Sequence, residues 1–136
     1  MVLFEHENFE IEYHADYKIV EVRWIGELDK NRLQLMIQQI IEAGQKQVTE
    51  NILLDATFVE APSSIATLKE EQVQHYFKLK MALPSVKKMA RVASGHDAYD
   101  ESILRHYITL MQFNTSSFEF RSFEHHYQAM DWIIGK

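Results

Sequence analysis

Apolar and polar side chains alternate in two neighbouring segments near the start of the chain. Residues 9–14 (FEIEYH) alternate aromatic or branched residues with polar ones, and residues 17–26 (YKIVEVRWIG) repeat the pattern with Trp24 on the apolar face. A period of two is typical of strands with one buried face. Because only Ala15 and Asp16 separate the two segments, we expect an antiparallel β-hairpin.

The rest of the chain alternates between helical spacing of apolar residues and short apolar runs. Helical spacing predicts amphipathic helices, whereas short apolar runs are typical of strands that are covered on both faces. Asp29 is the predicted N-terminal cap of the first helix and Gly44 its predicted end, and Pro84 ends the second helix. The predicted helices span about residues 30–44, 64–83, 98–110 and 123–134, and the predicted strands between them span about residues 51–55, 89–93 and 118–123.

These elements predict an α/β fold, in which an N-terminal antiparallel β-hairpin leads into a mostly parallel five-stranded sheet with about four helices. Alternating strands and helices form parallel sheets because their crossovers are right-handed. The strand at residues 9–14 would then be the antiparallel edge. A length of 136 residues suits a single domain that covers residues 1–136.

Composition and charge narrow the classes of function. The net charge is −6 and the chain has no cysteine, which excludes disulfides, thiol catalysis and cysteine-bound metals. No nucleic-acid partner is expected, because binding phosphates requires a basic surface. The densest basic stretch comprises Lys78, Lys80, Lys87, Lys88 and Arg91, and we interpret it as a solvated face.

The sequence contains no segment that predicts a membrane span. No apolar run approaches the length of about 20 residues that a spanning helix needs. The acidic segment 1–10 lacks the basic start of a signal peptide. We therefore expect a cytoplasmic protein.

Polar residues follow the predicted parallel strands, where open α/β sheets bind their ligands. They form a candidate ligand rim of Asp55, Thr57, Ser94, His96 and Asp97. The last three are the residue types of a hydrolytic triad, but they lie almost adjacent in one loop, whereas a triad draws its members from separate elements. A hydrolase is therefore the least favoured function, and no catalytic residue is assigned.

Metal and cofactor motifs are absent from the sequence. The seven histidines show no spacing typical of a metal site. His125 and His126 are adjacent, so on a helix their side chains would point about 100° apart. The chain has only four glycines and no glycine-rich phosphate loop. The sequence thus predicts neither a metal nor a cofactor.

The segment ILLDATFVEAPSSIATL (residues 52–68) resembles a motif of the STAS family, the domain of sulfate transporters and anti-sigma-factor antagonists. In that motif a strand and an aspartate lead to a serine pair at the start of a helix. Asp55 and Thr57 match the aspartate and the hydroxyl, and Ser63 and Ser64 match the serine pair. The resemblance implies that Ser63 and Ser64 form a partner-binding region with Ser64 as the candidate phosphoacceptor.

The serine pair has a second interpretation. Pro62 and Ile65 depart from the STAS motif, which has an acidic residue before the serines and a glycine after them. Ser63 or Ser64 would then only cap the helix, since a serine hydroxyl accepts hydrogen bonds from the first free N–H groups.

Landmarks along nearly the whole chain resemble the STAS-like, SpoIIAA-like group of small bacterial proteins, which is related in fold to the lipid-carrying SEC14 domain. The landmarks are the segments Trp24-Ile25-Gly26, Leu53-Leu54-Asp55, Lys88-Met89-Ala90-Arg91-Val92, residues 118–123 (FEFRSF) and Trp132-Ile133. The resemblance implies a STAS/SpoIIAA-like fold and a non-enzymatic regulatory domain that binds a protein partner or a second copy of itself, as a homodimer.

The SEC14 kinship leaves an alternative function open. Aromatic residues on the predicted helices could line a pocket for a small apolar or lipid-type ligand, although helical stripes normally face the core. These residues are Tyr76, Phe77, Tyr99, Tyr107 and Phe113.

Overall fold

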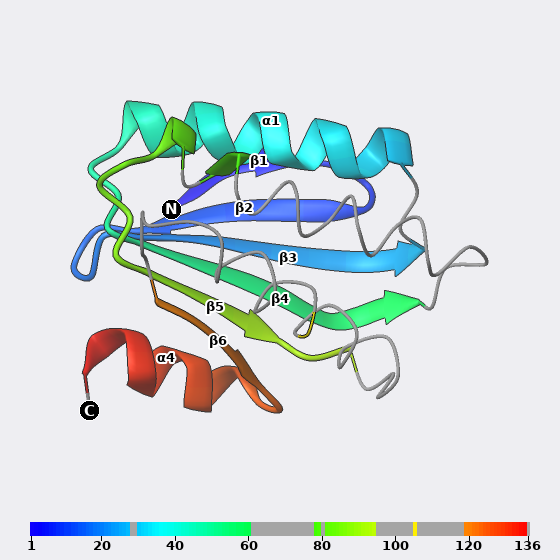
Figure 1. The fold of residues 1–136 in the computed structure, drawn as a ribbon. Helices are drawn as coiled ribbons and strands as arrows, with labels where there is room; N and C mark the ends of the chain where they lie inside the picture. Colours follow the sequence, from blue (N-terminus) through cyan, green and yellow to red (C-terminus); the bar gives the residue numbers. More distant parts are fainter. Residues whose placement is uncertain (28–29, 61–77, 80, 95–104, 106–118, 136) are drawn as a thin grey trace.

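A single mixed β-sheet forms the centre of the molecule (Figure 1). The computed structural model describes residues 1–27, 30–60, 78–79, 81–94, 105 and 119–135. Six strands lie in the sheet in the same order as in the chain. The strands are β1 (Val2–Glu5), β2 (Phe9–His14), β3 (Ile19–Glu27), β4 (Asn51–Glu60), β5 (Lys88–Val92) and β6 (Glu119–Phe123), and the helices that lie within the described residues are α1 (Lys30–Lys46) and α4 (His126–Ile134).

Strand β3 pairs antiparallel with the neighbour on one side and parallel with the neighbour on the other. Strands β1, β2 and β3 pair antiparallel, and β3 to β6 pair in parallel. The α/β class and the hairpin are therefore confirmed. The predicted number of five strands is wrong, because Val2–Glu5 adds a sixth strand and replaces residues 9–14 as the edge. This strand has only four residues, which is too short for an alternating pattern to stand out.

The hairpin loop is longer than predicted. The last pair of the β2–β3 ladder joins His14 to Ile19, so the loop comprises residues 15–18 and β3 does not start at Tyr17. Lys18 adopts a φ of 53°, a left-handed conformation that turns the chain back into the sheet. Its N–H donates to the carbonyl of Ala15 at 3.3 Å.

The predicted helices at residues 64–83 and 98–110 fall mostly outside the described residues, as does the predicted cap Asp29. The described end of the first of these segments is helical at Lys78, Leu79, Met81 and Ala82, and the helix stops before Pro84 as predicted. Neither α1 nor α4 is long and apolar enough to cross a bilayer.

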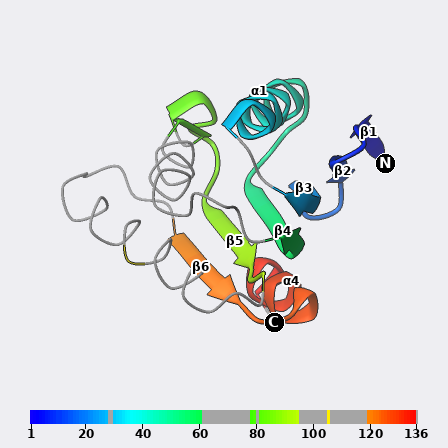
Figure 2. The same cartoon turned by 90° about the vertical axis from the view of Figure 1, so that its right-hand side faces the viewer.

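Helices α1 and α4 lie on opposite faces of the sheet (Figure 2). On the α1 face, apolar residues of α1 pack on alternate residues of β2, β3 and β4, including the fully buried Phe9, Ile11 and Ile52. On the α4 face, Ala129 and Ile133 pack on Ile19, Leu53, Ala90 and Val92. Each large aliphatic side chain buried in this way stabilises the fold by about 1.5–3 kcal/mol.

Gly44 lies inside α1, two residues before its end at Lys46, so the prediction that it ends the helix is wrong. An ideal Cβ atom on Gly44 would lie 2.6 Å from Cδ1 of Leu83. Glycine is therefore needed at this position because the buried Leu83 side chain packs against the helix backbone.

A β-bulge interrupts β4 where the sequence suggested that the strand ends. Arg23 pairs with Asp55, but the next pair joins Ile25 to Phe58, so β4 has one residue more than β3 in this interval. Such a bulge shifts the alternation of side chains by one residue. Beyond it Phe58 is 58% exposed and Val59 is buried. β4 thus continues to Glu60 rather than ending at Asp55.

Two basic residues that were assigned to a solvated face lie elsewhere. Arg91 is 2% exposed, because its strand β5 is covered on both faces. Lys88 is partly buried, and its Nζ atom donates a hydrogen bond to the backbone carbonyl of Trp132 at 3.0 Å. The same Nζ atom lies 5.2 Å from the centre of the Trp132 ring. The guanidinium of Arg121 lies 5.7 Å from the centre of the same ring. Two cationic side chains therefore lie within cation–π distance of Trp132.

Candidate functional site

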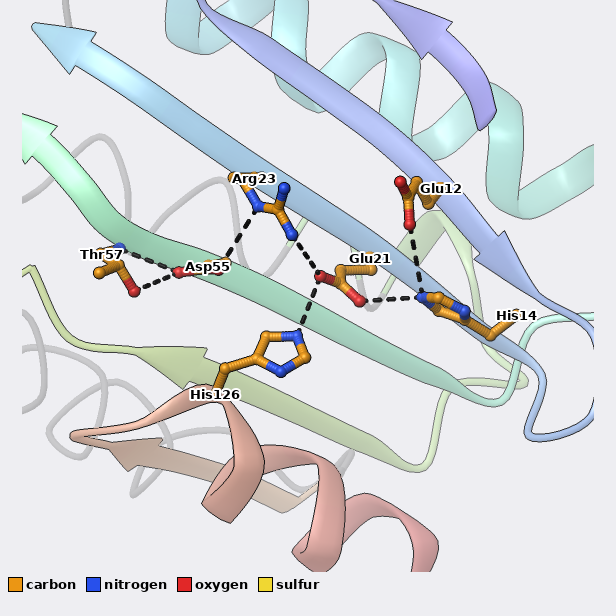
Figure 3. A network of polar contacts seen from close by, with 7 residues as sticks. All are labelled: Glu12, His14, Glu21, Arg23, Asp55, Thr57 and His126. Carbon is orange, nitrogen blue, oxygen red and sulfur yellow. Dashed lines mark hydrogen bonds and ion pairs between the residues drawn. The ribbon is translucent and has the colours of Figure 1, made fainter. Parts of the chain in front are cut away.

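Polar side chains occupy the part of the α4 face that lies towards β2. Along β3, Ile19 packs under α4, and Glu21 and Arg23 follow on the same face by alternation. Asp55 occupies the corresponding place on β4, opposite Arg23. With Glu12, His14, Thr57 and His126, these side chains form one network of polar contacts, which we call the Glu21 network (Figure 3).

Glu21 lies at the centre of the network and is only 5% exposed. Its Oε1 atom lies 2.9 Å from Nε2 of His14, and its Oε2 atom lies 3.0 Å from Nε2 of His126. Both imidazoles can donate an N–H to the carboxylate. Because a buried charge is costly unless it is hydrogen-bonded, the two histidines stabilise the burial of Glu21.

Arg23 connects the two buried carboxylates of the network. Its guanidinium lies 3.8 Å from Glu21 Oε2 and 3.7 Å from Asp55 Oδ2. Asp55 Oδ1 accepts hydrogen bonds from the N–H of Thr57, at 3.0 Å, and from its hydroxyl. These bonds cross the bulge and hold its backbone in place, as a local aspartate turn does.

Like charges meet at the β2 side of the network. Glu12 pairs directly with Glu21 across the ladder, and Glu12 Oε2 lies 3.9 Å from Nε2 of His14. On the same strand, the pKa of Glu10 is raised above its ordinary value by a hydrogen bond with the Glu12 side chain, by partial burial and by the charges of Glu12 and Glu5, while Arg23 acts in the opposite direction. The carboxylates of β2 are therefore crowded.

An apolar pair lies beyond the Glu21 network, at the carboxyl end of the parallel strands. Ile25 pairs with Phe58 across the β3–β4 ladder, and the two side chains are 52% and 58% exposed. We call them the Ile25–Phe58 pair. The bulge is the reason for this arrangement, because it turns Phe58 away from the core and places it beside Ile25.

The predicted ligand rim is described only in part. Asp55 and Thr57 are in contact, and Asp55 is buried while Thr57 is exposed. Ser94 is partly buried and lies two residues after β5, whose last residue Val92 pairs with Asp55. His96 and Asp97 lie outside the described residues, and so do Ser63, Ser64 and the predicted pocket aromatics Tyr76, Phe77, Tyr99, Tyr107 and Phe113.

Sequence reasoning missed the centre of the network. Glu21, His14 and His126 come from separate elements, and His126 is 105 residues from Glu21 in the chain. The pairing of Glu12 with Glu21 depends on the loop of residues 15–18, which the sequence did not predict, so the register of the hairpin gave no signal for this pair.

Comparison with known proteins rests on structure. No protein-family model and no curated protein matches the sequence. An uncharacterised protein of the DUF3478 family from Shewanella loihica, which has a SpoIIAA-like fold, shares 19% identity and a TM-score of 0.53, with 96% of this chain and 98% of that chain covered.

Two further solved structures are anti-sigma factor antagonists. SpoIIAA in its unphosphorylated form shares 14% identity and a TM-score of 0.55 over 94% of this chain and 97% of its own. The antagonist from Mycobacterium paratuberculosis shares 15% identity and a TM-score of 0.53 over 98% and 93%. All three matches extend over nearly the full length of both chains. The chain therefore has the SpoIIAA-like fold that the landmarks in its sequence predict.

Proposed function

We propose that this protein is a non-enzymatic regulatory domain that binds a protein partner at the Ile25–Phe58 pair. The observation that carries the proposal is the exposure of two large apolar side chains that lie next to each other on paired strands of the sheet. Protein interfaces have an apolar, often aromatic centre surrounded by polar groups. Here the Glu21 network supplies polar groups on one side of the pair.

The likeness to anti-sigma factor antagonists supports the same proposal. Those proteins are named for their action on another protein, and the matches cover 97% and 93% of their chains. The position of the pair supports it as well, since Phe58 lies on the strand that leads towards Ser63 and Ser64. In the STAS motif those serines belong to the partner-binding region.

The proposal is tested by purification of the tagged protein from its native host, followed by titration of the purified partner. We expect Phe58→Ser to weaken binding at least about tenfold, as the loss of an aromatic residue at the centre of an interface does. The side chain is exposed, so the fold should tolerate the change.

Val48→Ser is the matched control. Val48 is 66% exposed and precedes β4 at the opposite end of the strand. We expect Val48→Ser to bind the partner as the wild type does. Equal binding by Phe58→Ser and wild type, or an equal loss in both variants, would contradict the proposed surface.

A further inference from the structure

The Glu12–Glu21 pair is an electrostatic conflict that a cation would resolve. The two residues lie directly opposite each other on β2 and β3, where like charges destabilise a sheet. His14 is the neighbour of both carboxylates, with its Nε2 atom 2.9 Å from Glu21 Oε1 and 3.9 Å from Glu12 Oε2. Arg23 lies 3.8 Å from the other oxygen of Glu21, Oε2, and therefore offsets the crowding of the two carboxylates from the β4 side alone.

The ligand atoms of these three residues already lie close enough to share one ion. One atom from each of Glu12, His14 and Glu21 lies within 4.8 Å of the others. Ligand atoms bound to one ion at about 2.0–2.2 Å are themselves roughly 3–3.5 Å apart. The separations from His14 Nε2, 2.9 Å to Glu21 Oε1 and 3.9 Å to Glu12 Oε2, lie on either side of this range.

We propose that Glu12, His14 and Glu21 bind a single divalent transition-metal ion of the Zn²⁺ type. One imidazole and two carboxylates suit such an ion, whereas Mg²⁺ and Ca²⁺ favour sites made only of oxygen ligands. The side chains of Glu12 and His14 are each 33% exposed, so an ion can reach them from solvent. This inference does not depend on the proposed partner surface.

Glu21 also belongs to a second group of potential ligands, with Asp55 and His126. Arg23 lies on that side of Glu21 and contacts both carboxylates (Figure 3). A second cation there would be repelled by the guanidinium. His14 and Glu12 lie on the other side of Glu21, so the ion is assigned to their side.

His126 is a positioning residue in this arrangement. Its Nε2 atom contacts Glu21 Oε2, which is the oxygen that the ion would not bind. Hydrogen bonds to the free oxygen of a ligating carboxylate fix its orientation and strengthen the site.

The test is calorimetric titration of the full chain with ZnCl₂ near neutral pH, after treatment with a chelator and dialysis. We expect one Zn²⁺ per chain, much weaker binding of Mg²⁺, and a visible absorption band when Co²⁺ replaces Zn²⁺. His14→Asn should weaken Zn²⁺ binding at least about tenfold, and His126→Asn should weaken it less. His125→Asn is the matched control, because His125 precedes α4 but lies outside the Glu21 network, and it should bind as the wild type does.

Circular dichroism in the presence of chelator verifies that each variant is folded. If His14→Asn fails to fold, Glu12→Gln provides the same test at a partly exposed residue. The proposal is overturned if the wild type takes up no Zn²⁺, if it binds Mg²⁺ equally well, or if His14→Asn or its substitute Glu12→Gln binds Zn²⁺ as the wild type does. A loss of binding in His126→Asn but not in His14→Asn would also overturn it.

Discussion

His126 and Glu21 are 105 residues apart in the chain, and their side chains meet at 3.0 Å. The contact joins the first residue of α4 to Glu21, the third residue of β3. Apolar packing of Ala129 and Ile133 attaches the rest of the helix to the sheet. The His126–Glu21 contact therefore fixes the start of a helix whose far end is held by its apolar face and by the hydrogen bond from Lys88 to the carbonyl of Trp132.

Loss of this contact should destabilise the fold. We expect His126→Ala to lower the free energy of unfolding by about 1–3 kcal/mol, because it removes one hydrogen-bond donor from a buried carboxylate. Urea denaturation followed by circular dichroism measures the change. His125→Asn, which keeps a residue type suited to the position before a helix, should stay within about 0.5 kcal/mol of the wild type; equal losses in the two variants would contradict the role of His126.

Glu10 should make stability depend on pH. Its pKa is raised in the folded state above the ordinary value of 4.5, so the folded protein binds a proton more readily than the unfolded chain. The stabilising contribution of the proton is fully present below pH 4.5 and is lost as the pH rises through the raised pKa.

Glu10→Gln should therefore be more stable than the wild type near neutral pH, and the advantage should disappear in acid, where Glu10 is protonated. Denaturation at several pH values measures the difference. An advantage that is the same at all pH values would show that charge crowding is not its cause.

Gly44→Ala should destabilise the protein although alanine favours helices. The gain in helix propensity is about 0.5–1 kcal/mol, but the new methyl group would overlap the buried Leu83 side chain, and overpacking costs about 1–3 kcal/mol. In a Leu83→Ala background the overlap is removed, so Gly44→Ala should become neutral or stabilising. Thermal unfolding of the two single variants and the double variant measures this coupling.

Ser64 offers a test of the regulatory mechanism. A negative charge at Ser64 should weaken partner binding if this residue is the phosphoacceptor, because phosphorylation adds nearly two negative charges. We expect Ser64→Glu to bind the partner about tenfold more weakly and Ser64→Ala to bind it normally. Gln45→Glu adds the same charge at an exposed position of α1 and should have no effect; unchanged binding by Ser64→Glu would favour the helix-cap interpretation.

Local patterns were sufficient to predict most of the described strands. The alternation in residues 9–14 and the apolar run Ile52–Leu54 agree with the faces of these strands that are buried in the structure. The strand Val2–Glu5 was missed because it lies at the edge, and Leu3 and Phe4 are only partly buried there. Partly buried side chains leave only a weak alternation of apolar and polar residues in the sequence.

The polar network was harder to predict because its members depend on tertiary contacts. The spacing of His14 and His126 in the sequence carries no information about their common neighbour Glu21. Arg91 was misplaced for a related reason, since its charge suggested solvent while its strand is covered on both faces. Composition describes a residue type, whereas the environment of each residue is set by the fold.

The bulge between Asp55 and Phe58 has a consequence for comparing this chain with others. Before the bulge, even-numbered residues of β4 such as Ile52 and Leu54 face α1, and after it the odd-numbered Val59 does. In a relative that lacks one residue here, the residue at the place of Val59 would still face α1, and the position of the missing residue would decide which side chain lies beside Ile25. An insertion or deletion of one residue at this point can thus change what the surface recognises while leaving the hydrophobic interior as it is.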